Sequence, residues 1–124
     1  MAVDPRGADL KRYLADDPGG PVVMLNLLRF AEDGRDLYDK YAAALEETFL
    51  PKYGGEVIFA ADGSTTLVAE EGQGAWDAVL LVRYPSREHF SRMVADPDYQ
   101  QVTHWRTQAL DEAVLQATVS WSAA

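Results

Sequence analysis

The chain of 124 residues contains no cysteine, which excludes disulfide bonds, thiolate nucleophiles and thiolate metal ligands. Basic residues are scarce: 11 lysines and arginines stand against 20 acidic residues, and the net charge is -9. Because this charge repels polyanions, we expect no nucleic-acid partner and no binding to membranes. The two histidines, His89 and His104, lack the spacing of metal ligands, so we predict no metal and no other cofactor.

Long hydrophobic runs are also missing. The longest apolar segment is far shorter than the roughly 18 residues that a membrane span needs, and residues 1–20 contain no apolar centre of a signal peptide. We therefore expect a soluble, cytoplasmic protein. A chain of this length suits one domain, with residues 1–20 as an N-terminal helix and lead-in and residues 21–124 as the main α+β domain.

Two dense apolar runs stand out, residues 22–30 (VVMLNLLRF) and residues 78–85 (AVLLVRYP). Both are too apolar for a strand with one wet face, and each precedes a segment whose apolar residues recur at helical spacing. The first of these helices is expected from about residue 36. In the second segment, Ser86 and Asp96 are suited to begin two helices, because their side-chain oxygens can accept hydrogen bonds from free backbone N–H groups.

The remaining pattern completes a familiar order of elements. Asp4 and Pro5 predict the start of a short leading helix, since aspartate caps helices well and proline suits the first turn. Further strands are expected at residues 56–60, resumed at 65–69, and at residues 114–121. The order strand, helix, strand, strand, helix, strand predicts an α+β, ferredoxin-like sandwich, an antiparallel sheet with its helices on one face.

Both faces of the predicted sheet are apolar. In the first run, Val23 and Leu25 point to one face while Met24 and Leu28 point to the other. Helices on one side can cover only one of these faces. Because a stable monomer does not leave an apolar sheet face of this size in water, we predict a homodimer whose two sheets pack face to face into a barrel.

Several phrases in the chain resemble a known family: VVMLNLLRF, DGRDLYDKYAAAL, KYGGEV, WDAVLLVRYPSREHF and MVADPDYQQVTHWRTQAL. Together they are similar to the domain of unknown function family 1330, within the dimeric α/β-barrel superfamily. The resemblance implies the dimeric barrel and no established reaction. Neighbouring branches of that superfamily include cofactor-free monooxygenases, haem-degrading enzymes and lactone isomerases, so fold alone does not choose a function.

Polar residues in apolar surroundings are the candidates for a ligand-binding site. Asn26 lies in the middle of the first strand, on the face that we assign to the interior of the predicted barrel. A buried amide there must be paired, either with a ligand or with a neighbour such as Tyr41 or Arg83. Arg83 is expected on the same face as Asn26, near a strand end, where its planar fork could hold a carboxylate or an enolate oxygen. Alternatively, Arg83 forms an ordinary ion pair at the surface.

The segment THWRTQAL brings His104 and Arg106 together on the last helix. His104 is a candidate general base, and Arg106 is a further candidate for ligand binding. The alternative for His104 is a solvated helical residue without a catalytic role. Other aromatic residues at helical spacing, among them Tyr38 and Tyr99, are interpreted first as the core between helices and sheet.

Three functions remain open on this basis. The first is binding of a small hydrophobic or aromatic metabolite in a pocket lined by sheet and helices, with Asn26, Tyr41, Arg83 and Arg106 as polar contacts. The second is a cofactor-free monooxygenase or isomerase for a hydrophobic carbonyl compound, with His104 as base. The third is an interaction module without a ligand.

Overall fold

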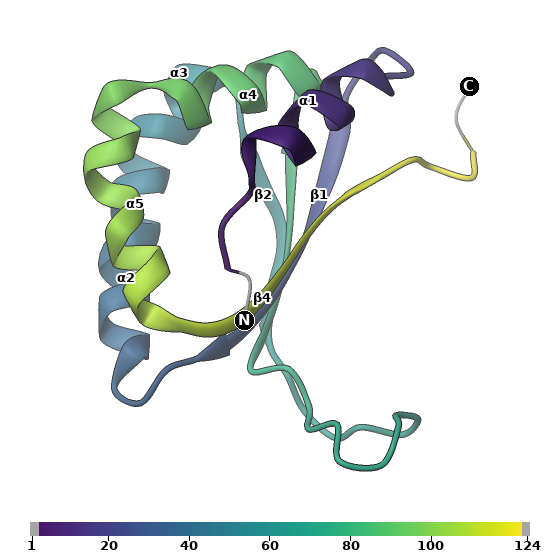
Figure 1. The fold of residues 1–124 in the computed structure, drawn as a ribbon, viewed down its shortest axis with the longest axis vertical. Coiled ribbons are helices and arrows are strands. Elements are labelled where there is room, and N and C mark those ends of the chain that lie inside the picture. Colours follow the sequence, from purple (N-terminus) through teal and green to yellow (C-terminus); the bar gives the residue numbers. More distant parts are fainter. Residues whose placement is uncertain (1–2, 123–124) are drawn as a thin grey trace.

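The computed structural model describes residues 3–122, which form a four-stranded sheet with helices against it (Figure 1). The strands are β1 (Val22–Phe30), β2 (Glu56–Asp62), β3 (Ala78–Tyr84) and β4 (Leu110–Thr118), in the order β2-β3-β1-β4. Every pair of neighbouring strands is antiparallel. This topology confirms the predicted α+β, ferredoxin-like fold.

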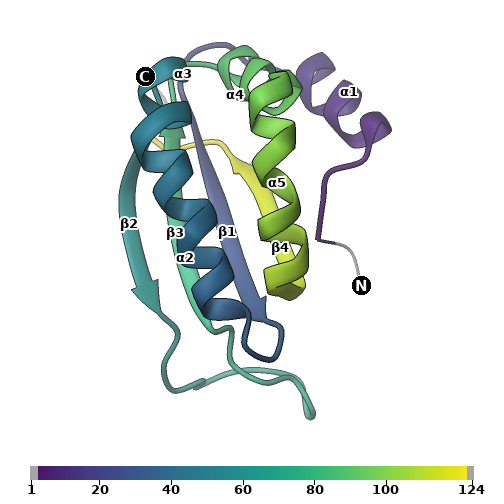
Figure 2. The ribbon, with the colours of Figure 1, turned by 90° about the vertical axis from the view of Figure 1, so that its left-hand side faces the viewer.

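The helices gather on one side of the sheet (Figure 2). Helices α2 and α5 lie side by side over the sheet, while α1 and α4 lie beside each other near one end of it. Among the described residues, the opposite face carries no helix. The helical segments are α1 (Gly7–Ala15), α2 (Gly34–Ala44), the π-helical turn η1 (Leu45–Phe49), α3 (Leu50–Tyr53), α4 (Arg87–Ala95) and α5 (Pro97–Ala109).

The strand register decides which side chains share a face. In β1, Asn26 pairs with Leu80 of β3 and with Leu115 of β4, so these three residues point to the same side of the sheet. This side, the covered face, lies under the helices and carries Val22, Met24, Asn26, Leu28, Ala78, Leu80, Val82, Tyr84, Ala113, Leu115 and Ala117. The other side, the open face, carries Val23, Leu25, Leu27, Phe59, Val79, Leu81, Arg83, Val114 and Gln116.

Two predicted helix starts are confirmed. The Ser86 side-chain oxygen accepts a hydrogen bond from the backbone N–H of His89 at 3.1 Å, and this interaction begins α4. The Asp96 carboxylate accepts one from the backbone N–H of Asp98 at 2.9 Å and begins α5, with Pro97 in the first turn. In both cases the side chain satisfies an N–H group that the first turn leaves without a helical partner.

The predicted helix start at Asp4 and Pro5 is wrong. Helix α1 begins at Gly7, with Arg6 as its N-cap residue. The carboxylate of Asp4 instead accepts hydrogen bonds from the side-chain hydroxyl of Thr107 at 3.0 and 3.1 Å. A contact with the far end of the chain therefore replaces the local cap.

The helix expected from about residue 36 begins at Gly34 and changes its winding near its end. A Cβ atom on Gly34 would lie 2.2 Å from the carbonyl oxygen of Ala109, so glycine allows α2 to start against the end of α5. Pro51 lies in the first turn of α3 and lacks the N–H that a continuous α-helix would use four residues back. The widened turn η1 lies directly before α3, where this donor is missing.

The strand boundaries differ from expectation at two places. Residues 65–69 do not resume a strand: they lie in the long connection between β2 and β3, where Leu67 is 91% and Val68 is 94% exposed. This connection projects away from the sheet (Figure 1). The last strand spans Leu110–Thr118 rather than residues 114–121. It begins directly after the last residue of α5, Ala109. Of the helices in residues 3–122, none has both the length and the apolar character to span a membrane.

Candidate functional site

A cavity of about 290 Å³ lies between the covered face and the helices. Its walls come from all four strands on one side and from α2, η1, α3, α4 and α5 on the other. The lining is mainly aliphatic and aromatic, with a few polar groups, which is typical of sites for small molecules. The polar residues of the lining include Asn26, Tyr38, Tyr41, Tyr84, Tyr99, Thr103 and Arg106.

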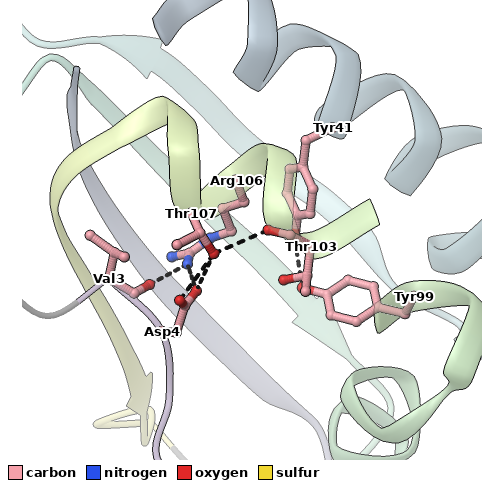
Figure 3. A network of polar contacts seen from close by, with 7 residues as sticks. All are labelled: Val3, Asp4, Tyr41, Tyr99, Thr103, Arg106 and Thr107. Atoms are coloured by element: carbon pink, nitrogen blue, oxygen red, sulfur yellow. Dashed lines mark hydrogen bonds and ion pairs between the residues drawn. The ribbon is translucent and has the colours of Figure 1, made fainter. Parts of the chain in front are cut away.

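Tyrosines from two helices meet beside this cavity. Tyr41 of α2 and Tyr99 of α5 share a hydrogen bond between their hydroxyl oxygens at 2.7 Å, and both residues are buried (Figure 3). The ring of Tyr38 lies 5.6 Å from that of Tyr41, and the ring of Phe49 lies 5.6 Å from that of Tyr99. These edge-to-face and tilted contacts fix the two hydroxyl groups in one place.

The phenol groups of Tyr38 and Tyr41 are neutral at physiological pH. Burial, the largest cause, raises the pKa of Tyr41 well above its usual value, and the neighbouring Tyr99 raises it further. Burial likewise raises the pKa of Tyr38, against a smaller opposing effect of the Arg106 charge. Neutral phenols donate and accept hydrogen bonds but are poor bases, so this cluster is suited to holding an oxygen atom rather than to removing a proton.

The expected side of Asn26 is wrong: the residue lies on the covered face, under the helices, and not on the face toward the barrel interior. There it lines the cavity. Its side-chain amide donates to the backbone carbonyl of Met24 at 3.3 Å, a long bond to a residue of the same strand. The residue is half-buried. Since one long bond leaves much of the capacity of a carboxamide unused, Asn26 can offer both a donor and an acceptor to a bound molecule.

Arg106 of α5 is buried, with 5% of its surface exposed, and lines the same cavity. One terminal nitrogen, Nη1, donates to the backbone carbonyl of Val3 and lies 3.4 Å from the Asp4 carboxylate (Figure 3). The other, Nη2, is buried without a hydrogen-bond partner in the described part of the chain. The predicted site residues Asn26, Tyr41 and Arg106 thus line one cavity.

Residues 3–5, the N-terminal strap, close one side of this arrangement. Asp4 and Pro5 line the cavity, and they also line a neighbouring cavity of about 360 Å³ that lies between α1 and β4. Met24 and Phe90 belong to both linings as well. The strap therefore lies between the two cavities, and its hydrogen bonds with Arg106 and Thr107 hold it in place.

The expected position of Arg83 is wrong. Arg83 pairs with Val23 of β1 and with Glu56 of β2, which places it on the open face, opposite Asn26. The side chain is exposed and takes no part in the cavity lining. The expectation failed because alternation within one strand defines two faces without telling which of them matches a given face of the next strand.

His104 also lies away from the cavity. It is exposed on α5, with its ring 5.5 Å from that of Trp105, whereas Thr103 and Arg106 of the same helix line the cavity. The other histidine, His89, is bound to the Ser86 hydroxyl at 2.6 Å at the start of α4. Within residues 3–122, no three histidine, aspartate or glutamate side chains are grouped closely enough to hold a metal ion.

Sequence reasoning did not assign Tyr38, Tyr99, Thr103 or Asp4 to the site. A signal existed for the tyrosines, because a buried phenol in an apolar helical stripe requires a partner for its hydroxyl group. No such signal existed for Asp4, whose partners Arg106 and Thr107 lie about a hundred residues further along the chain.

Comparison with solved structures finds close likeness in fold. The chain is 27% identical to the RPA0582 protein of unknown function from Rhodopseudomonas palustris, with 94% of each chain covered and a TM-score of 0.84. It is 15% identical to a dimeric ferredoxin-like protein of unknown function from Thermobifida fusca, which covers 83% of this chain and 93% of that chain with a TM-score of 0.54. An uncharacterized NIPSNAP-like domain protein from Burkholderia xenovorans is 13% identical, with 82% and 86% covered and a TM-score of 0.56.

The likenesses to the Thermobifida fusca and Burkholderia xenovorans proteins show a shared fold and nothing more. No curated protein matches the chain. The family described as a domain of unknown function, DUF1330, matches residues 28–118, which include β1 from Leu28, the helices α2 to α5 and all of β2, β3 and β4. The chain therefore belongs to the DUF1330 family, as the resemblance of its sequence phrases implied.

Proposed function

We propose that this protein binds a small hydrophobic or aromatic molecule in the cavity between its sheet and its helices. The observation that carries the proposal is a cavity of about 290 Å³ whose mainly apolar lining includes the polar groups of Asn26, Tyr41 and Arg106. An engineered protein cavity of roughly 150 Å³ accepts benzene. A single ring with a short polar substituent therefore suits the space available here.

Binding is better supported than catalysis. The enzyme alternative requires a general base beside the substrate, and His104 lies on the exposed side of α5, outside the cavity lining. Tyr38 and Tyr41 of the lining have raised pKa values, which favour neutral hydrogen-bonding groups over proton acceptors. The third alternative, an interaction module, does not explain why Nη2 of Arg106 is buried without a partner among residues 3–122.

The test is a ligand screen with three matched pairs of single-ring compounds: benzoate and benzamide, phenylacetate and phenylacetamide, cinnamate and cinnamamide. Thermal shift identifies binding, because a ligand that binds only the folded state raises its stability, and titration calorimetry then gives the dissociation constant. We expect at least one pair member to raise the unfolding temperature in a dose-dependent way at millimolar concentration.

Two neighbouring alanines of α2 provide a matched pair of variants. Ala42 lines the cavity, whereas Ala43 is exposed on the same helix. Ala42→Leu should fill part of the space and weaken binding at least tenfold, while Ala43→Leu should leave binding unchanged. Equal binding by the two variants, or no response to any of the six compounds, would contradict the proposal.

We also propose that the protein is a homodimer formed through the open face. The helices leave this face bare, and its side chains include Leu25, Leu27 and Leu81, half-buried in the single chain. An apolar sheet surface of this kind favours contact with a second protein surface. The likeness to a dimeric ferredoxin-like protein supports self-association. Light scattering coupled to gel filtration should give twice the chain mass at micromolar concentration, and a clean monomer would contradict the proposal.

A further inference from the structure

Arg106 carries a buried positive charge, and among the described residues only one of its two terminal nitrogens has hydrogen-bond acceptors. The residue is 5% exposed, and its Nη1 atom meets the Val3 carbonyl and the Asp4 carboxylate, the latter at 3.4 Å. Its Nη2 atom is buried and has no acceptor among the described residues. A buried guanidinium group with an unused donor is costly, because the donor has lost its water without gaining a partner.

The acidic residues that line the cavity in the described part of the chain are exposed, unlike Arg106. The two acidic residues of the lining, Asp4 and Glu46, are both exposed residues, and Asp4 already faces Nη1. The charge of Arg106 acts on the phenols of Tyr38 and Tyr41, which are neutral. The buried charge of the lining is therefore the positive charge of Arg106, although the protein as a whole has a net charge of -9.

From this arrangement we infer that the ligand carries a carboxylate, which binds the guanidinium group of Arg106. This inference rests on the proposed function and names its ligand class: single-ring or comparably small carboxylic acids. A carboxylate is the group that pairs most strongly with a guanidinium, in the short, charge-assisted geometry that arginine favours. The amide of Asn26 and the hydroxyl groups of Tyr41 and Tyr99 line the same cavity and can hold other oxygens of the ligand.

The N-terminal strap keeps the guanidinium group in place for this role. Its Val3 carbonyl and Asp4 carboxylate hold Nη1, and Asp4 is in turn fixed by the Thr107 hydroxyl at 3.0 and 3.1 Å (Figure 3). The Asp4 side chain is 45% exposed, so its attraction for Arg106 is weakened by solvent. A ligand carboxylate inside the cavity would lie in a drier environment and would interact more strongly with the same group.

The same three acid and amide pairs test the inference, since each amide matches its acid in shape but lacks the charge. The wild-type protein should bind the acid of a pair at least tenfold more tightly than its amide. Arg106→Met keeps the length of the side chain and replaces a buried cation with an apolar group, a change that proteins often tolerate. This variant should lose the preference for the acid and retain binding of the amide. Arg92→Met, which removes an exposed arginine of α4, is the control and should keep the preference.

The possible outcomes separate the two claims. If amides bind as tightly as their acids to the wild-type protein, the inference is overturned while the proposed function stands. If none of the six compounds binds, both fail. Should Arg106→Met fail to fold, the comparison of acid with amide in the wild-type protein decides the matter, and an acid preference that weakens as salt is added supports the role of a charge.

Discussion

The two faces of the sheet are similar in sequence and different in what surrounds them. On β1, Leu25 of the open face and Leu28 of the covered face are the same residue type three positions apart. Leu28 is 0% exposed under the helices, whereas Leu25 is half-buried. The difference teaches that the apolar pattern marks both faces as buried surfaces, while the chain's own helices cover only one.

The polar chemistry is divided unequally between the faces. Asn26, the tyrosine cluster and Arg106 all lie on the covered side, where burial makes each unpaired polar group costly. On the open side, Arg29 is paired with Glu112 and stacks at 4.0 Å from the centre of the Trp76 ring, so its charge is already partnered. A site for a small molecule is therefore expected on the covered side and a protein contact on the open side.

The largest effect on the free energy of unfolding is expected from a substitution in the covered face. Leu28→Ala should lower the free energy of unfolding by about 2–5 kcal/mol, because it leaves a hole among fully buried side chains. Leu25→Ala should cost less than about 1 kcal/mol at concentrations where the chain is monomeric, since this side chain keeps part of its contact with water. Urea unfolding at submicromolar concentration measures both. Equal losses would mean that the two faces are equally covered within one chain.

A charge on the open face should have the next largest effect. Leu81 pairs with Leu25 across β3 and β1, and Leu81→Asp places a carboxylate in the proposed dimer contact. Burying that charge without a partner costs at least about 3 kcal/mol, which weakens the dimer more than about a hundredfold. Gel filtration with light scattering should then give the monomer mass, with an unchanged circular dichroism spectrum.

Leu14→Asp is the control for this experiment, because Leu14 is 41% exposed on α1 and lies away from the open face. It should leave the dimer intact. A Leu81→Asp protein that still ran as a dimer would place the contact elsewhere on the molecule.

A smaller effect is expected from the hydroxyl pair of Tyr41 and Tyr99. Tyr41→Phe removes one member of a buried hydrogen bond of 2.7 Å and leaves the other hydroxyl without its partner. The expected loss is about 1–3 kcal/mol in the free energy of unfolding. Tyr99→Phe should cost a similar amount, and the double variant should cost less than the sum, because it removes both polar groups together. Strictly additive losses would show that the two hydroxyl groups do not depend on each other.

Sequence reasoning recovered local features better than the side of the sheet on which a residue lies. The high apolar content of residues 22–30 predicted a strand with Asn26 among apolar neighbours. The side-chain oxygens of Ser86 and Asp96, which can accept hydrogen bonds from free backbone N–H groups, predicted two helix starts. Both kinds of signal are local: alternation follows from strand geometry, and capping depends on residues two or three positions apart. Such features can be recognised without knowledge of the rest of the chain.

The misplaced residues depended on distant contacts. The face of Arg83 is set by its pairing with Val23 and Glu56, and one strand's alternation does not contain that register. The role of Asp4 is set by Thr107 and Arg106, so a residue well suited to cap a helix is used to hold the strap. In residues 65–69, a strand-like pattern has no neighbouring strand to pair with and remains an exposed connection.

The smallest expected effect concerns Asp96, which begins the helix that carries Tyr99 and Arg106 over the covered face. Its carboxylate accepts from Lys52 at 2.8 Å and from the Tyr53 hydroxyl at 2.6 Å, and these bonds, the one from Lys52 first, hold the pKa of Asp96 below its usual value. A carboxyl group whose pKa is lower in the folded state stabilises the fold above the unfolded-state pKa of about 4, and this stability is lost as the pH falls through the lower folded-state value.

The free energy of unfolding of the wild-type protein should therefore decrease between pH 5 and pH 3, and Asp96→Asn should make this decrease smaller. The midpoint of urea unfolding, measured at intervals of about half a pH unit, follows both changes. Asp9 provides the exposed counterpart: its pKa is lowered to about 2, first by the hydrogen bond from Arg6, on the surface of α1. Because solvent screens such a pair, Asp9→Asn should change the pH dependence less than Asp96→Asn does. If the two variants had the same effect, the buried network at the start of α5 would stabilise the helices over the covered face no more than an ordinary surface ion pair.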